Sequence, residues 1–347
     1  MVNNMCVFLA LFVAFLITFS STPLMIVLGY DLGIVDTPKD TRRVHKKSIP
    51  LIGGIGIFYG FIVSVSCFAI IDDHVLGILL GGILLVTLGV FDDIKPIKAS
   101  NKLVIQIVAA SIAVLCGVKI EYIANPFLKH SFINFNNWFS SFITIFWIVG
   151  ITNAINLIDG LDGLAVGVSS IASFGMLSFA LFLNELNVSI MVAAIAGSGL
   201  GFLPYNFNPA KIFMGDAGST FLGFTLACLS IEGLFKTHAV ISFLVPVLIL
   251  GFPVFDTIFA IFRRALSGKH VMLPDKEHLH HKLIDFGFTQ RQSVSILYTM
   301  TAALSLSAVV MYIKGFMRAV FLILSVLFLV IASAKYVIVE KRKQNGK

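Results

Sequence analysis

Charge is scarce in this chain. Asp, Glu, Lys and Arg together make up 12% of its 347 residues, against roughly 25% in soluble domains. Apolar residues make up 58%, and the mean hydropathy is +0.96. These values exclude an ordinary soluble domain and indicate a polytopic membrane protein. A basic stripe interleaved with aromatic residues is also lacking, so we expect no nucleic-acid partner.

Cysteine is rare as well, and its placement indicates neither a disulfide framework nor a metal site. Apolar runs contain all four cysteines without metal-ligand spacing: Cys6, Cys67, Cys116 and Cys228. We expect them to pack as small buried hydrophobic residues. The first residues carry no positive charge, which argues against a cleaved signal peptide and for a retained first span.

Apolar runs long enough to cross a bilayer, which takes roughly 17–25 residues, occur eleven times. They are 5–30, 51–71, 75–91, 103–118, 139–155, 163–183, 188–204, 218–235, 239–262, 294–313 and 319–338. We therefore predict an all-α, polytopic membrane protein with about eleven transmembrane helices and cytoplasmic active-site loops. Lysine and arginine favour the cytoplasmic side, and one side of these spans holds 19 of them against 5 on the other. This bias places the N-terminus outside and the C-terminus in the cytoplasm.

Ten of the eighteen acidic residues gather in or beside five polar stretches that this topology places in the cytoplasm. The stretches are 36–54, 92–102, 153–165, 206–219 and 274–283. The ten residues are Asp36, Asp40, Asp92, Asp93, Asp159, Asp162, Asp216, Asp275, Glu277 and, inside a span near its cytoplasmic end, Asp256. A chain that only anchors itself in lipid needs no such gathering, whereas phosphate chemistry at the membrane surface does.

Asp92 and Asp93 close the third span. Two adjacent carboxylates at a helix C-terminus repel each other and oppose the helix dipole, so a divalent metal or a lysine is expected to offset them. Lys95, Lys98 and Lys102 follow directly. The alternative interpretation is a solvated acidic turn with no further role.

Asp159 and Asp162 lie three residues apart, and Asn153 and Asn156 repeat this spacing one turn earlier. Residues at this spacing share a helix face, so the four predict a polar ridge that emerges from an apolar span. Such a ridge is costly in lipid and typical of a wet cleft. Helix capping would explain one of these residues but not four.

Asp216 lies in "FMGDAGS", between two glycines and at the start of a predicted helix. This turn offers backbone N–H groups to a phosphate and a carboxylate oxygen to Mg²⁺. Ser219 is the candidate cap of the same helix.

His278, His280 and His281 lie in "PDKEHLHHKLIDFG", which is predicted to form a short helix at the membrane surface. On a helix, 278 and 281 share a face and 280 points away. We favour a phosphate-contacting surface, with imidazoles as donors, over a zinc site, which needs a defined ligand geometry.

Two further features need an explanation. Lys46 belongs to a basic juxtamembrane cluster, which commonly sets topology or contacts lipid headgroups; the Pro-x-x-Gly-Gly that follows is expected to shape a cleft wall. Asp256 lies within a predicted span, where an ionisable side chain needs a partner. Arg263 and Arg264 are the candidates.

Four signatures occur together in this chain: the Asp92-Asp93 pair after a span, "NAINLIDGLDGLA", "NPAKIFMGDAGSTFLG" and "PDKEHLHH". In this combination the chain resembles the polyprenyl-phosphate N-acetylhexosamine-1-phosphate transferases. That family includes the enzymes that begin wall teichoic acid, O-antigen and enterobacterial common antigen, and the phospho-N-acetylmuramoyl-pentapeptide transferase of peptidoglycan. The resemblance covers about 31–293, the motif-bearing core of a single predicted integral membrane domain over 1–347. The "EHLHH" form resembles the branch that uses UDP-N-acetylglucosamine.

The resemblance implies a reaction and its partners. A UDP-N-acetylhexosamine, with UDP-N-acetylglucosamine favoured, gives its sugar 1-phosphate to undecaprenyl phosphate and releases UMP. The product initiates a lipid-linked glycan at the bacterial plasma membrane. The family depends on Mg²⁺, with Mn²⁺ as an alternative. Membrane lipids are further expected partners, and the resemblance leaves open whether the protein forms a homodimer.

The resemblance also implies residue roles. Asp216 is the leading metal ligand, joined by Asp93 and Asp159. Asp92 or Asp93 acts on the acceptor phosphate as base or orienting group, with one-step transfer favoured over a covalent aspartyl intermediate, and His281 is counted with these catalytic residues. The implied substrate contacts are Lys46, Lys102, Asn156, Asp159, Asp162, Phe213 as the aromatic that stacks on uracil, His278 and His280.

Three rival interpretations remain. The first is the same reaction with another UDP-N-acetylhexosamine derivative. The second is a lipid-linked sugar flippase or an ion-coupled transporter, which should carry its ionisable residues near the bilayer midplane rather than at the span ends. The third is a membrane zinc hydrolase built on the histidines, although no His-Glu-x-x-His helix is present.

Overall fold

The computed structural model describes residues 2–37, 48–124, 132–235, 244–266 and 278–327, and helices dominate all of these segments. The helices in chain order are α1 (Val2–Asp31), α2 (Gly53–Phe68), α3 (Asp73–Ile94), α4 (Ala99–Leu115), α5 (Asn137–Ile158), α6 (Leu164–Phe182), α7 (Leu186–Asn206), α8 (Gly215–Ser230), α9 (Leu244–Ile249), α10 (Gly251–Leu266), α11 (Leu279–Asp285) and α12 (Gln290–Lys314). A π-helical turn, η1 (Ile231–Phe235), extends α8, and a further helix runs over Phe316–Leu327. The four strands are β1 (Val35–Asp36), β2 (Ile49–Pro50), β3 (Tyr122–Ala124) and β4 (Phe132–Asn134).

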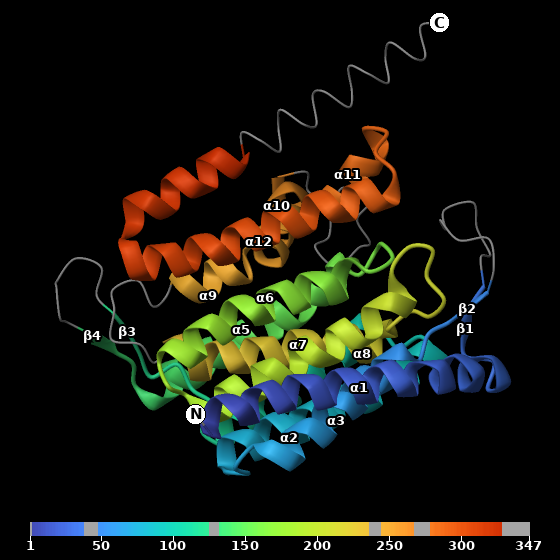
Figure 1. Cartoon of the computed structure of the whole chain (residues 1–347), viewed down its shortest axis with the longest axis horizontal. Helices are drawn as coiled ribbons and strands as arrows, with labels where there is room; N and C mark the ends of the chain where they lie inside the picture. The colour runs from blue at the N-terminus through green and yellow to red at the C-terminus, as the bar shows by residue number, and fades with distance from the viewer. Residues whose placement is uncertain (1, 38–47, 125–131, 236–243, 267–277, 328–347) are drawn as a thin grey trace, which may run out of the picture.

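The helices lie side by side along the long axis of the molecule, and the connections gather at its two ends (Figure 1). The antiparallel pair β1–β2, in which Val35 lies opposite Pro50, marks one end. The antiparallel pair β3–β4, in which Ile123 lies opposite Ile133, marks the other. The short helix α11 lies toward the β1–β2 end (Figure 1). This arrangement is that of a helical bundle with its connections at the two ends.

Within the part of the chain that the structure describes, six helices are long and apolar enough to cross a membrane, which confirms an all-α, multi-pass membrane protein. They are α1, α3, α5, α6, α7 and α12. The other five predicted spans fall on shorter helices: α2, α4, α8 with η1, α9 with α10, and Phe316–Leu327. The count of eleven spans therefore stays a prediction.

The predicted span at 239–262 is not one continuous helix where the structure describes it. α9 ends at Ile249, and α10 begins at Gly251. Pro253 explains the break, because a proline has no N–H to donate and its ring clashes with the carbonyl four residues earlier, here that of Ile249. The position of Pro253 in the sequence would have allowed this break to be predicted.

The bundle is apolar on both its inner and its outer surfaces. Helix α8 lies at the centre, packed against α2, α3 and α5, and every residue from Ala217 to Ser230 is buried. A helix surrounded by protein in this way needs no polar face. At the outside, α1 exposes Phe8, Phe12, Leu16 and Phe19. These residues repeat about every fourth position, so one face of α1 is suited to contact with lipid.

Gly89, which has no side chain, allows α3 to lie close to the first turn of α8. A Cβ atom on Gly89 would clash with both the backbone N and the Cα of Ala217. Only glycine therefore allows this approach, and the approach sets the last turn of α3, with Asp92 and Asp93, beside Asp216.

We expect Gly89→Ala to lower the free energy of unfolding by about 1–3 kcal/mol, because the added methyl meets backbone atoms that cannot rotate away. Gly150→Ala is the matched control, since Gly150 also lies within a helix but a Cβ there would have nothing within 4 Å. Thermal unfolding of both variants in the same detergent provides the measurement. Equal melting temperatures for the two variants would contradict the close approach of α3 and α8.

Candidate active site

The first turn of α8 is held by a carboxylate from α3. Oδ1 of Asp93 accepts the N–H of Asp216 at 3.0 Å, and its Oδ2 accepts that of Ala217 at 3.5 Å. The first N–H groups of a helix have no intrahelical partner, so Asp93 serves as their cap from a distant part of the chain. The predicted cap, Ser219, is wrong: it lies one turn inside α8 and donates to the carbonyl oxygen of Gly215 at 3.0 Å.

This capping also corrects the expectation that the turn offers its N–H groups to a phosphate. The amides of Asp216 and Ala217 are already bound to Asp93. The amide of Gly218 donates to the carbonyl oxygen of Met214 at 3.1 Å. The start of α8 therefore presents the side chain of Asp216, rather than the backbone amides of residues 216–218, to a ligand.

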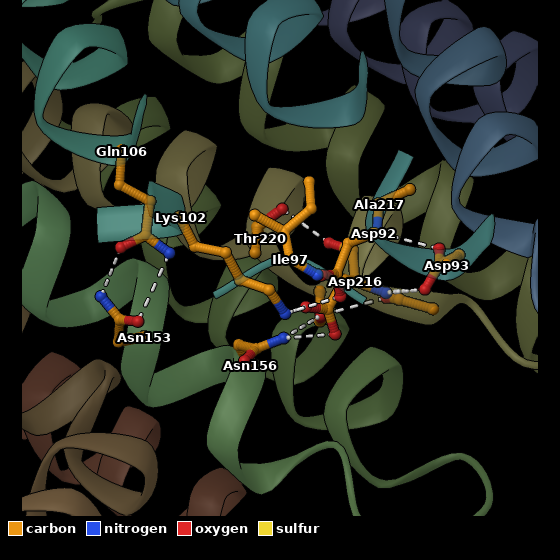
Figure 2. A network of polar contacts seen from close by, with 12 residues as sticks. Asp92, Asp93, Ile97, Lys102, Gln106, Asn153, Asn156, Asp216, Ala217 and Thr220 are labelled. Atoms are coloured by element: carbon orange, nitrogen blue, oxygen red, sulfur yellow. Dashed lines mark hydrogen bonds and ion pairs between the residues drawn. The ribbon is translucent and has the colours of Figure 1, made fainter. Parts of the chain in front are cut away.

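Lys102 joins the two carboxylates nearest to it. Its Nζ lies 2.6 Å from Oδ2 of Asp92 and 2.6 Å from Oδ2 of Asp216 (Figure 2). The other oxygen of Asp92 accepts the N–H of Ile97 at 2.7 Å. Lys102 is thus the lysine that was expected to offset the acidic pair. Oxygens of Asp92, Asp93 and Asp216 lie within 4.8 Å of one another, close enough to hold one metal ion.

Two asparagines of the predicted ridge on α5 bind other side chains (Figure 2). Asn156 donates to Oδ1 of Asp216 at 3.1 Å and to Oγ of Ser219 at 2.8 Å. Asn153 forms an amide pair with Gln106 of α4, with N–O distances of 2.7 and 3.3 Å. Gln106 was not identified from the sequence, although a single amide inside the apolar run of α4 is a usable signal.

All five polar stretches contribute to one cleft of about 360 Å³. Its lining includes Asp36, Asp93, Asp159, Asp162, Phe213, Asp216, His281 and Gln290. Five of these are aspartates, and no lysine or arginine lines the cleft among the residues described. Burial of the Asp159 carboxyl, together with the charges of Asp216 and Asp162, raises its pKa to about 8. Burial and the neighbouring carboxylates thus make ionisation of Asp159 unfavourable, and a bound cation would favour it.

Asp162 has a partner that the ridge pattern did not show. Helix α5 ends at Ile158, so Asp162 lies beyond it. Oδ2 of Asp162 accepts the side-chain N–H of Asn208 at 2.8 Å and the backbone N–H of Ala210 at 3.0 Å. Asn208 also donates to Oε1 of Gln290 at 2.7 Å. Asp162 therefore fixes the loop before α8, and Asn208 and Gln290 are cleft-shaping residues that the sequence did not reveal.

The three histidines lie together. His278 precedes α11 as its N-cap residue, so the helical spacing used for the prediction does not apply, and the expectation that His280 points away is wrong. The rings of His278 and His280 are parallel with centroids 5.7 Å apart, and those of His280 and His281 are 4.3 Å apart. Burial, with His281 nearby, lowers the pKa of His280 to about 3. A Cβ on Gly160 would lie within 2.4 Å of Nε2 of His280, so this glycine makes room for the ring.

Asp256 belongs to the same cluster. The sequence suggested Arg263 or Arg264 as its partner. Its hydrogen-bonding partners in the structure are Nδ1 of His278, at 2.8 Å, and the backbone N–H of Leu279, at 2.9 Å.

A second cleft, of about 750 Å³, adjoins the first. Its polar lining includes Asp92, Lys102, Gln106, Asn153, Arg264 and the three histidines, and its apolar lining includes Leu88, Leu103, Leu157, Ala260 and Ile261. Asn156, Gly160, Asp216 and His281 line both clefts. The two clefts therefore meet at Asp216.

Of the predicted site residues, Lys46 lies outside the described residues, as do Asp40, Asp275 and Glu277. The group of side chains that could hold a metal ion among the described residues consists of carboxylates without a histidine. This composition favours Mg²⁺ or a similar hard ion over zinc.

Comparison with known proteins identifies the family of this chain. A family model described as glycosyl transferase family 4 matches residues 75–234. The chain is 38% identical to a probable undecaprenyl-phosphate N-acetylglucosaminyl 1-phosphate transferase of Bacillus subtilis strain 168 over 337 residues, which are 96% of this chain and 93% of that protein. It is 32% identical to a decaprenyl-phosphate N-acetylglucosaminephosphotransferase of Mycobacterium leprae, covering 85% of this chain and 81% of the other. It is 30% identical to an undecaprenyl-phosphate alpha-N-acetylglucosaminyl 1-phosphate transferase of Escherichia coli O157:H7. That match covers 79% of this chain and 75% of the other protein.

We expect Lys102→Met to destabilise the protein by about 1–3 kcal/mol, because Asp92 and Asp216 then lose their shared cation. Lys98→Met is the control, since Lys98 is exposed and lies on the same helix end. Melting temperatures measured with and without millimolar Mg²⁺ provide the test. Added Mg²⁺ should raise the melting temperature of Lys102→Met more than that of the wild type. Equal losses for the two lysine variants would refute the bridging role.

Proposed function

This chain belongs to the polyprenyl-phosphate N-acetylhexosamine-1-phosphate transferases, within glycosyl transferase family 4, and from this membership we propose that it transfers N-acetylglucosamine 1-phosphate from UDP-N-acetylglucosamine to undecaprenyl phosphate. UMP leaves, and the lipid-linked sugar diphosphate is the starting unit of a cell-envelope glycan. Undecaprenyl is preferred to decaprenyl because the relative with 38% identity is named for it.

The meeting of two clefts with different chemistry carries this proposal. The smaller cleft is acidic and contains Phe213, an aromatic surface on which a nucleobase can stack. The larger cleft combines apolar walls with Lys102 and Arg264, which suits a lipid with an anionic headgroup. Both substrates would reach the residues that the clefts share, so their phosphates would meet beside Asp216.

A divalent metal fits the smaller cleft for reasons of charge. A sugar nucleotide brings a diphosphate into a cleft that is lined by five aspartates, and the two would repel each other without an added cation. We propose that Mg²⁺ is held by Asp216 and Asp93, with Asp92 or Asp159 as a further ligand. Carboxylate oxygens are its preferred ligands, and Mn²⁺ accepts the same set. When bound, the ion would neutralise charge that develops on the transferred phosphoryl group.

The contacts of Asp92 and Asp93 support transfer in one step. Both oxygens of Asp93 face the N–H groups of α8, and both oxygens of Asp92 are bound, one to Ile97 and one to Lys102. Carboxylates engaged in this way suit orientation and charge balance better than nucleophilic attack. In the proposed step an oxygen of the acceptor phosphate attacks the β-phosphorus of the donor while the bond from that phosphorus to the oxygen retained by UMP breaks.

The remaining proposed roles follow from the side of the site on which each residue lies. Phe213 and Asp162 shape the donor cleft, and Asn156 orients Asp216. Lys102, at the head of the larger cleft, would contact the acceptor phosphate. His278, His280 and His281 would donate to phosphate oxygens or position one another, and Lys46 is proposed as a further phosphate contact from the sequence alone.

The direct test is transfer of radiolabel. Purified protein with Mg²⁺, undecaprenyl phosphate and UDP-N-acetylglucosamine, labelled in the sugar and in the β-phosphate, should move both labels to the lipid and release UMP. A panel of other UDP-N-acetylhexosamines tests the sugar in the same assay. Transfer of the sugar without its phosphate, or release of UDP, would overturn the proposed reaction.

Asp216→Asn should reduce turnover by roughly a hundredfold or more, because the loss of a metal ligand exceeds the tenfold to hundredfold effect of an outer-sphere partner. Asp73→Asn, at the exposed start of α3, is the matched control and should leave turnover unchanged. Both variants are assayed at saturating Mg²⁺ after their melting temperatures have been compared. Turnover of the Asp216 variant near that of the wild type would remove the metal-ligand assignment.

We also propose that the end of the bundle with the two clefts faces the cytoplasm, where the nucleotide sugar is made, and that the N-terminus lies outside. The excess of lysine and arginine in the loops at this end supports that orientation. Reporter proteins fused after Lys98 or Asp285 should therefore report a cytoplasmic location, and fusions after Asn184 or Lys314 an external one. The reverse pattern would reject this orientation, and a mixed pattern within either pair would reject the common site.

A further inference from the structure

The histidines form a continuous row of rings from the protein interior to the meeting point of the clefts. His278 and His280 are buried, with 4% and 1% of their surface exposed. Their parallel rings are 5.7 Å apart, and His280 contacts His281 with centroids at 4.3 Å. All three line the larger cleft, and His281 lines the smaller one as well. The place of His281 in the site thus depends on the rings behind it.

One carboxylate fixes the buried end of this row. Oδ2 of Asp256 lies 2.8 Å from Nδ1 of His278, and Oδ1 accepts the N–H of Leu279 at 2.9 Å. The two side chains are 7% and 4% exposed, so solvent competes little for the pair. Asp256 therefore fixes the orientation of the His278 ring and the position of Leu279, the first residue of α11.

The carboxylate of Asp256 also determines which ring nitrogen of His278 carries the hydrogen. An ionised carboxylate only accepts hydrogen bonds, so Nδ1 of His278 must carry a hydrogen. In the neutral ring Nε2 is then the bare nitrogen. The next ring, His280, is held by packing rather than by charge: it fits against Gly160, its Nδ1 has no hydrogen-bond partner among the described residues, and burial keeps it neutral at pH 7 by lowering its pKa to about 3. A change in the orientation of the His278 ring would therefore be passed on to His280 by contact.

We propose that Asp256 is a positioning residue for phosphoryl transfer, which sets the tautomer and orientation of His278 and thereby places His280 and His281 where the two clefts meet. Asp256 lines neither of these clefts; it borders a separate apolar groove with Phe255 and Phe259. It therefore cannot touch the reacting atoms and acts only through the histidines. This inference rests on the proposed function and adds to it a residue outside the site.

Asp256→Asn tests the proposal with almost no change in size. The amide oxygen can still accept the N–H of Leu279, so the start of α11 stays capped. The amide nitrogen then faces Nδ1 of His278 and donates to it, which moves the ring hydrogen to Nε2. We expect turnover to fall by roughly tenfold to hundredfold, the usual effect of removing a carboxylate that orients a functional histidine. We expect the KM for the nucleotide sugar to change by less than about threefold, since the donor cleft does not include Asp256.

The tautomer is read independently of activity. In protein labelled with ¹⁵N in the histidine rings, His278 should carry its hydrogen on Nδ1 in the wild type and on Nε2 in Asp256→Asn, with the signal assigned by its loss in His278→Asn. This measurement separates the inference from the proposed reaction: a change of tautomer without any transferase activity in the wild type would refute the reaction alone. An unchanged tautomer would overturn the role of Asp256.

A double-mutant cycle separates positioning from general stability. His278→Asn retains an N–H donor for Asp256 but has no tautomer, so Asp256→Asn should cost little further turnover in that background. A full, additive loss there would overturn the inference. Asp285→Asn, at the exposed end of α11, is the control and should match the wild type. If Asp256→Asn fails to fold, His278→Asn alone decides the outcome: it should lose turnover at a wild-type melting temperature, and unchanged turnover would reject the proposal.

Discussion

Two helices at the polar end of this bundle begin where a carboxylate from another helix accepts their backbone N–H groups. Asp93 of α3 holds the start of α8, and Asp256 of α10 holds the start of α11. The first turn of a helix has N–H groups without partners and a partial positive charge. In a chain with so few polar side chains, the carboxylate gains hydrogen-bond donors and the helix start gains an acceptor for its N–H groups. The residues that follow, Asp216 and His280, belong to the clefts, so the contacts that hold the fold also build the site.

The charge balance of the site follows from this construction. Two carboxylates about 4 Å apart repel each other by about 4 kcal/mol at an effective dielectric constant near 20, which exceeds the roughly 1 kcal/mol of an ordinary hydrogen bond. One lysine, Lys102, cannot balance Asp92, Asp93 and Asp216 together. The raised pKa of Asp159, about 8, is a further sign of the surplus. The bundle therefore assembles a cleft that a cation would stabilise, and an anionic substrate would be accepted best together with that cation.

The sequence was informative about local properties and much less so about long-range partners. Spacing predicted the polar residues at the end of α5. The repulsion between Asp92 and Asp93 predicted a divalent metal or a lysine beside them, and Lys102 does bind Asp92. The cap of α8 was assigned to Ser219 because Ser219 is near in sequence, whereas Asp93 is more than 120 positions away. Asp256 was given an arginine of its own helix for the same reason. Gly160 leaves the space that the ring of His280 fills, and nothing near Gly160 in the sequence indicates this contact. Such pairings depend on how the helices pack, which hydrophobic periodicity does not determine.

The position of the remaining polar groups explains how one end of an apolar bundle can receive both a lipid and a nucleotide. Gln106 and Asn153 line the larger cleft, and each side-chain amide donates a hydrogen bond to the oxygen of the other. The polar groups of this wall therefore already have partners. The carboxylates and Lys102 lie beyond them, next to Asp216. A hydrocarbon chain would thus meet a wall whose polar groups are already paired, and its headgroup would meet the charged residues. The smaller cleft approaches the same aspartate with unbalanced negative charge. Each proposed substrate would therefore be matched along its own path, and the two paths share the residues at which a phosphoryl group would pass between them.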